Sequence, residues 1–173
     1  QKLMLAATLM HQPDLLLLDE PTTGVDPVSR REFWRILAGL HREGKTVVIA
    51  TPYMDEAERC SYLAFLSGGR IIREGAPAAL KAVVPGTLFE LTTAEPRVAL
   101  AAVASMPGVR SVHLYGDVVR ALWTGDGRGA DELNLRLVEM GVPITTIRPA
   151  RVDMEAAFAF LAEPERPAGV AQP

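Results

Sequence analysis

Residues 15–27, LLLLDEPTTGVDP, give the strongest indication of fold in this 173-residue sequence. Four leucines lead directly into Asp19 and Glu20, which makes a continuous apolar run of strand length that ends in two carboxylates. Such a run is typical of a strand that is covered on both faces, as in a parallel sheet. Open α/β sheets bind ligands at the carboxyl ends of their strands. The stretch therefore predicts two carboxylates at a ligand-binding edge.

Adjacent carboxylates at the end of an apolar strand have a clear use in phosphoryl transfer. Such charges are costly to bury unless a cation or hydrogen-bond donors compensate them. One carboxylate can hold Mg²⁺ through its water shell, and the next can orient and deprotonate an attacking water. The turn PTTG follows, and then Asp26, for which a role as turn former or helix cap is the plain alternative.

The segments on either side of this stretch predict a parallel α/β sheet. Residues 1–11 (QKLMLAATLMH) predict a helix that is apolar around most of its circumference and normally buried on several sides. Residues 29–41 have apolar positions at helical spacing, and residues 45–50 (KTVVIA) predict a second buried strand. The runs at 62–66 and 71–74 predict an antiparallel hairpin added at the edge of the sheet.

A different pattern begins near residue 85. Strands are expected at 87–92, 109–115, 118–124 and 144–148, and helices at 96–106 and 130–140. This order, βαββαβ, is that of the ferredoxin-like split unit. A last helix is expected at 154–161. We therefore expect an α/β domain at 1–84, a ferredoxin-like α+β domain at 85–162 and a disordered tail at 163–173.

Composition excludes several classes of protein. Apolar residues make up 49% and charged residues 23%, which is ordinary for a globular protein. A net charge of −3 and a pI of about 5.7 argue against a nucleic-acid partner. Cys60 is the single cysteine, so the chain contains no intrachain disulfide. The longest apolar runs are far shorter than the roughly 18 residues of a membrane-spanning helix.

The string LLLLDEPTTGVDP resembles, position for position, the Walker B strand, catalytic glutamate and D-loop of ABC ATPases. The resemblance implies that Asp19 is the metal-side aspartate and Glu20 the general base. It also implies that Gly24, Val25 and Asp26 form the D-loop, which touches a partner nucleotide-binding domain. Residues 1–21 resemble the segment after the ABC signature sequence.

Residues 46–60 (TVVIATPYMDEAERC) resemble the strand and switch loop of the same family, with one departure. The family usually has Thr-His where this chain has Thr51-Pro52, so Pro52 occupies the position of the histidine that contacts the γ-phosphate. Losing one preorganised contact to developing charge typically lowers a rate by about 10²–10³-fold. Proline offers neither a side-chain donor nor a backbone N–H. Slower hydrolysis and a silent site both remain open.

The resemblance implies ATP and Mg²⁺ as cofactors. As partners it implies a second nucleotide-binding domain and a transmembrane permease, with the subunit peripheral on the cytoplasmic face of the cell membrane. Residues 85–162 resemble the accessory domain of export-type ABC ATPases. The sequence has no GxxxxGK(S/T) motif and no signature at the expected place, and it opens inside a predicted helix. We therefore expect an exporter ATPase in an intact parent protein and an inactive chain by itself; the alternative is a non-catalytic regulatory or interaction protein derived from an ABC ATPase.

Overall fold

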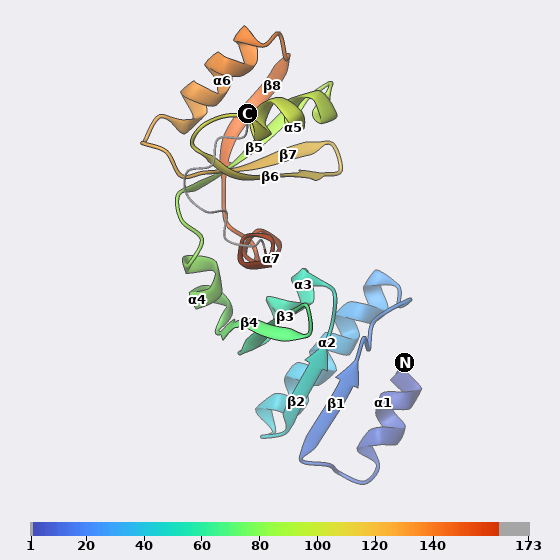
Figure 1. The fold of residues 1–173 in the computed structure, drawn as a ribbon. Helices are drawn as coiled ribbons and strands as arrows, with labels where there is room; N and C mark the ends of the chain where they lie inside the picture. The colour runs from blue at the N-terminus through green and yellow to red at the C-terminus, as the bar shows by residue number, and fades with distance from the viewer. Residues whose placement is uncertain (1, 163–173) are drawn as a thin grey trace. The chain divides into compact units, whose positions relative to one another are not determined.

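The computed structural model describes residues 2–162 (Figure 1), and the predicted tail at 163–173 lies outside the described residues. The chain divides into two compact units, Gln1–Ala57 and Glu58–Pro173. The first unit contains α1 (Lys2–Leu9), β1 (Leu15–Asp19), α2 (Pro27–Arg42), β2 (Thr46–Ala50) and α3 (Met54–Ala57). Strands β1 and β2 pair in parallel, with Leu15 opposite Thr46 and Asp19 opposite Ala50.

Only one face of the β1–β2 pair is covered in the first unit. Leu16 is buried, as are Phe33, Trp34 and Leu37 of α2, whereas Leu17 is 71% exposed. Successive strand residues point to opposite faces, so the leucine run has one covered side and one open side. The expectation of a strand covered on both faces is therefore wrong for this chain.

Helix α1 also differs from its prediction. Met4 is exposed, Met10 just beyond the helix is exposed as well, and Leu5 is the single buried residue among the described side chains of the helix. The expectation that this helix is buried on several sides is wrong for this chain, because the first unit covers the helix only on the side of Leu5.

The second unit begins with a hairpin. Strands β3 (Leu63–Ser67) and β4 (Arg70–Gly75) pair antiparallel through a turn at Gly68 and Gly69, both with positive φ, and α4 (Pro77–Ala82) follows. Within residues 2–162 this hairpin is a separate two-stranded sheet, so the expected addition to the edge of the parallel sheet is wrong. Phe65 instead packs edge-to-face on Phe158, with ring centroids 5.1 Å apart.

Residues 87–150 form a four-stranded antiparallel sheet with the order β6-β7-β5-β8. Its elements are β5 (Thr87–Thr93), α5 (Pro96–Ala104), β6 (Val109–Tyr115), β7 (Val118–Trp123), α6 (Gly129–Glu139) and β8 (Ile144–Ala150). Leu91 and Val119 of the sheet share one buried core with Val103 of α5 and Leu137 of α6. The two helices therefore cover the same face of the sheet; Figure 1 shows both helices beside its strands.

The last helix, α7 (Met154–Ala162), connects the hairpin segment to this sheet. The Asp153 carboxylate accepts a hydrogen bond from the Ala156 N–H at 2.9 Å, and it forms an ion pair with the Arg120 guanidinium at 2.6 Å. The Glu58 carboxylate accepts a hydrogen bond from the Met154 N–H at 3.1 Å and pairs with the Lys81 ammonium group, also at 3.1 Å. These contacts explain why the compact units divide at 57/58, whereas the domain boundary predicted from sequence, 84/85, remains a prediction.

Candidate functional site

The carboxyl ends of β1 and β2 lie side by side in the first unit. Asp19 is the register partner of Ala50, and the Glu20 N–H donates to the Ala50 carbonyl at 2.8 Å. Thr51 and Pro52 follow directly. The structure thus brings the predicted metal-side aspartate, the predicted base and the start of the predicted switch loop to one edge of the parallel pair.

Glu20 is held by its own turn. Its φ is +42°, a left-handed conformation that typically costs a non-glycine residue on the order of 1–3 kcal/mol. The Thr23 hydroxyl donates to the Glu20 carboxylate at 3.0 Å, and the Thr23 N–H donates to the Glu20 carbonyl at 3.1 Å. The exposed carboxylate therefore has a fixed direction at the strand end, which suits a group that must orient a water molecule.

Asp19 is exposed at the end of β1. Within residues 2–162 no group of three or more His, Cys, Asp or Glu side chains gathers to hold a metal ion. Mg²⁺ commonly keeps several waters and takes one or two carboxylates together with nucleotide phosphates. Asp19 therefore suits Mg²⁺ as one ligand beside a bound nucleotide, and not as part of a closed protein cage.

Gly24 and Asp26 shape the turn into α2. Gly24 has φ +74°, which favours glycine. Asp26 is the N-cap of α2: one carboxylate oxygen accepts from the N–H groups of Val28 and Ser29, both at 3.0 Å. The Ser29 hydrogen bonds hold the pKa of the Asp26 carboxyl below its ordinary value. The capping role, left open by the sequence, is present, and a D-loop contact stays a prediction.

Pro52 lies exposed between β2 and α3. The Tyr53 N–H donates to the Thr51 hydroxyl at 3.1 Å, and this hydrogen bond closes the turn around Pro52. The proline ring supplies no donor at this edge. The effect of Pro52 on hydrolysis stays a prediction.

Sequence reasoning missed a buried polar group behind this edge, the Glu56 network (Thr22, Arg30, Thr51, Tyr53 and Glu56). Glu56 is 0% exposed and accepts hydrogen bonds from the hydroxyls of Thr22 and Thr51. The Arg30 guanidinium lies over the Tyr53 ring, 4.8 Å from its centroid. Nothing in the spacing of MDEAE separates this glutamate from its acidic neighbours, so only the packing identifies it.

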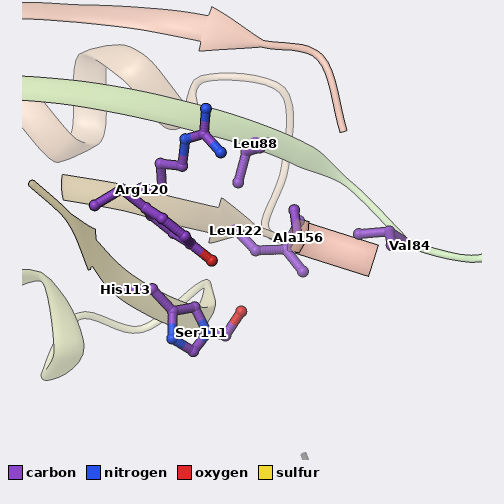
Figure 2. A pocket seen from close by; sticks show the side chains of 8 residues that line it. Val84, Leu88, Ser111, His113, Arg120, Leu122 and Ala156 are labelled. Atoms are coloured by element: carbon purple, nitrogen blue, oxygen red, sulfur yellow. The ribbon is translucent and has the colours of Figure 1, made fainter. Parts of the chain in front are cut away.

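The second unit contains a small cavity at the face of its sheet (Figure 2). Ser111, His113 and Arg120 line it together with Val84 and Ala156. Its volume of about 10 Å³ is that of a single water-sized space. It is far too small for a nucleotide.

Comparison with known proteins gives a partial alignment. No family model matches the chain. The probable multidrug ABC transporter ATP-binding protein YbhF of Escherichia coli (strain K12) is 50% identical over 82 residues, 47% of this chain and 14% of that protein. The Nod factor export ATP-binding protein I of Neorhizobium galegae is 51% identical over 81 residues, 46% of this chain and 23% of that protein. These curated homologues, at about 50% identity over about half of this chain, are ABC transporter ATP-binding proteins.

The chain spans about a quarter or less of the length of these relatives. Among solved structures, UvrA2 from Deinococcus radiodurans matches 79% of this chain and 19% of its own chain, at 19% identity and a TM-score of 0.36. A likeness this low supports no argument about fold or function. None of the helices within residues 2–162 has the length and apolar character needed to cross a membrane.

Proposed function

We propose that this chain supplies the Walker B strand, the general base and the D-loop of a nucleotide-binding domain, in an ABC-type ATPase that powers export. One observation carries the proposal: Asp19 and Glu20 end a parallel strand beside the end of β2. The relatives named for ATP binding in ABC transporters support it, because they match about half the chain at about 50% identity.

In this proposal Glu20 is the catalytic base. It accepts a proton from the water whose oxygen bonds to the γ-phosphorus of ATP while the bond to the β-phosphate oxygen breaks. Thr23 orients Glu20 through the 3.0 Å hydrogen bond to its carboxylate. Bound Mg²⁺ would neutralise phosphate charge, and Asp19 would hold it from the protein side. Gly24 and Asp26 would contact the second nucleotide-binding domain.

The remainder of the nucleotide site must come from outside these residues. The sequence contains no GxxxxGK(S/T) loop, whose backbone N–H groups hold phosphates. The open face of the parallel pair exposes Leu15, Leu17 and Val48, which is the kind of surface that a further part of a domain covers. We infer that the chain by itself binds ATP poorly and hydrolyses none. Micromolar ATP affinity of the isolated chain in a calorimetric titration would refute this inference.

Residues 85–162, which lie within the second unit, are proposed to be an accessory domain of ferredoxin-like class. Its strand order β6-β7-β5-β8, with every neighbouring pair antiparallel and two helices on one face, supports that assignment. A fold of this class carries no chemistry by itself, so we assign it an interaction role. The partners in this account are a second nucleotide-binding domain and a membrane permease, on the cytoplasmic face, without nucleic acid.

A second candidate function is a non-catalytic regulatory protein derived from such an ATPase, and Pro52 favours it. The two candidates separate in a Pro52→His variant of the complete protein that carries this sequence. Restoring a donor at that position should raise ATP turnover by about 10²–10³-fold if the edge is catalytic. A matched change at an exposed position of α2, Arg35→His, should leave turnover unchanged. Absence of turnover in both wild type and Pro52→His favours the regulatory candidate.

A further inference from the structure

Glu56 is the most deeply buried carboxylate in the first unit. Its side chain has 0% exposure, and it lies on the four-residue helix α3. The Thr22 hydroxyl donates to one carboxylate oxygen, and the Thr51 hydroxyl donates to the other at 2.9 Å. Arg30 Nε lies 3.7 Å from the oxygen that Thr22 contacts. A buried carboxylate is tolerated when donors and a cation surround it in this way.

The two hydroxyl donors come from different loops. Thr22 belongs to the turn after β1, which also holds Glu20, and Thr51 begins the loop after β2, which also holds Pro52. Each threonine donates its hydroxyl to a different oxygen of the same Glu56 carboxylate. One carboxylate therefore spans the gap between the loops at the carboxyl edge of the parallel pair.

Each threonine is also built into the geometry of its own loop. The Thr22 carbonyl accepts from the Val25 N–H at 3.0 Å, and the next residue, Thr23, orients the Glu20 carboxylate. The Thr51 hydroxyl accepts from the Tyr53 N–H at 3.1 Å while it donates to Glu56. A displacement of the Glu56 carboxylate therefore affects the turn that presents Glu20 and the turn that presents Pro52 together.

Arg30 adds a third attachment from α2. Its backbone N–H donates to the Asp26 carbonyl at 2.9 Å, in the first turn of the helix. Its guanidinium lies over the Tyr53 ring at 4.8 Å, and its Nε faces Glu56. The start of α2, the end of the turn after β1 and the loop after β2 thus meet at one carboxylate.

We propose that Glu56 is a positioning residue that couples the turn carrying Glu20 to the loop carrying Pro52. Its two oxygens hold Thr22 and Thr51 at fixed separation, so that a movement in either loop is transmitted to the other. The coupling itself rests only on the Glu56 network, and its consequence for catalysis rests on the proposed ATPase function. A carboxylate suits this role, because it offers an acceptor oxygen to each threonine, whereas a carboxamide offers one acceptor oxygen in place of two.

Amide hydrogen exchange on the 173-residue chain tests the coupling without nucleotide. Glu56→Gln should speed exchange at the Thr23, Val25 and Tyr53 amides by about tenfold. Asp55→Asn is the matched control, because Asp55 is an exposed carboxylate on the same short helix, and it should change these rates by less than about twofold. Unchanged rates in Glu56→Gln would overturn the proposal.

Substitutions of the two threonines give a sharper test, because they show whether a change in one loop alters amide exchange in the other. Thr22→Val keeps the shape of the side chain and removes its donor, and it should speed exchange at Tyr53 in the other loop. Thr51→Val should likewise speed exchange at Thr23 and Val25. In a chain that already carries Glu56→Ala, adding Thr22→Val or Thr51→Val should cause no further increase in the exchange rates of the opposite loop. Effects confined to the loop that carries each substitution would contradict the coupling, as would equal acceleration throughout α2, which indicates a loss of stability alone.

Steady-state kinetics of the complete protein tests the consequence for catalysis. Glu56→Gln should lower kcat by about tenfold or more and leave the KM for ATP within about twofold, since Glu56 positions the base and does not touch the nucleotide. Glu56→Asp should restore part of kcat. An increase in KM with unchanged kcat would contradict positioning. If wild-type protein hydrolyses no ATP, the proposed function fails, and the exchange measurements still determine whether Glu56 couples the loops.

Discussion

Glu20 combines a strained backbone with a fixed side chain. A left-handed φ of +42° is unfavourable for glutamate, and the hydrogen bond from Thr23 holds the carboxylate in that unfavourable turn. Residues in such conformations cluster at functional sites, where the protein is less stable than it could be because a side chain is held in the orientation that its function needs. The sequence predicted the position of Glu20 at a strand end, but no pattern in DEPTTG reports the backbone angle.

Replacing Glu20 by glycine should therefore stabilise the first unit while it removes the proposed base. Glycine adopts positive φ without strain, so we expect Glu20→Gly to raise the free energy of unfolding by about 1 kcal/mol. Chemical denaturation of the isolated chain measures this change. Glu43→Gly is the control, because Glu43 has φ −77° and gains nothing from glycine. A destabilised Glu20→Gly chain would contradict the strain.

Asp26 should contribute stability through its cap on α2. Asp26→Ala should lower the free energy of unfolding, and Asp26→Asn should lower it by much less, since asparagine also caps. The folded pKa of Asp26 is lowered, so its charge-dependent contribution is present above the ordinary aspartate pKa of about 3.9 and is lost as the pH falls through the folded value.

The comparison of wild type with Asp26→Asn as a function of pH checks this assignment. The difference in unfolding free energy between the two should be constant near neutral pH and should narrow below about pH 4. Denaturant titrations at a series of pH values measure it. A difference that widens under acid conditions would show that the carboxylate is not the group that stabilises the helix.

At the scale of elements, the sequence predicted the identity of most helices and strands and failed on their surroundings. The leucine run is a strand, and the βαββαβ order of residues 87–150 matches the predicted order of elements. The prediction that both faces of β1 are buried was wrong, because an apolar sequence shows that a strand favours burial but does not show which neighbouring layers are present to cover it. Packing of α7 against the hairpin was also beyond prediction, since it depends on contacts between segments about 90 residues apart, such as Phe65 with Phe158.

Helix α7 should depend on the cap and ion pair that Asp153 supplies. Asp153→Ala removes both the hydrogen bond to the Ala156 N–H and the partner of Arg120, so we expect the free energy of unfolding to fall by about 1–3 kcal/mol. Glu155→Ala is the matched control in the first turn of the same helix, where the side chain is exposed. Thermal unfolding of both variants measures the difference. Equal effects of the two substitutions would mean that general helix-end electrostatics, and not Asp153, hold α7.

At the scale of the whole molecule, the two units carry different parts of the proposed function. The first unit holds Asp19, Glu20 and the Glu56 network, and the second holds a packed four-stranded sheet with a buried core. The matched segments make up 14% and 23% of two of the relatives. In the proposed function, the base belongs to this chain, and the phosphate-binding loop, whose motif the sequence lacks, comes from outside these residues.

The rate of ATP hydrolysis by the complete protein, measured for wild type and Glu20→Gln, tests this account most directly. Glutamine keeps the size of the side chain and cannot accept the proton from water. Turnover should fall by at least about 100-fold, with ATP retained in a dimer of nucleotide-binding domains, and Glu43→Gln should match the wild type. Wild-type turnover in Glu20→Gln would remove Glu20 from the role of base and with it the central claim.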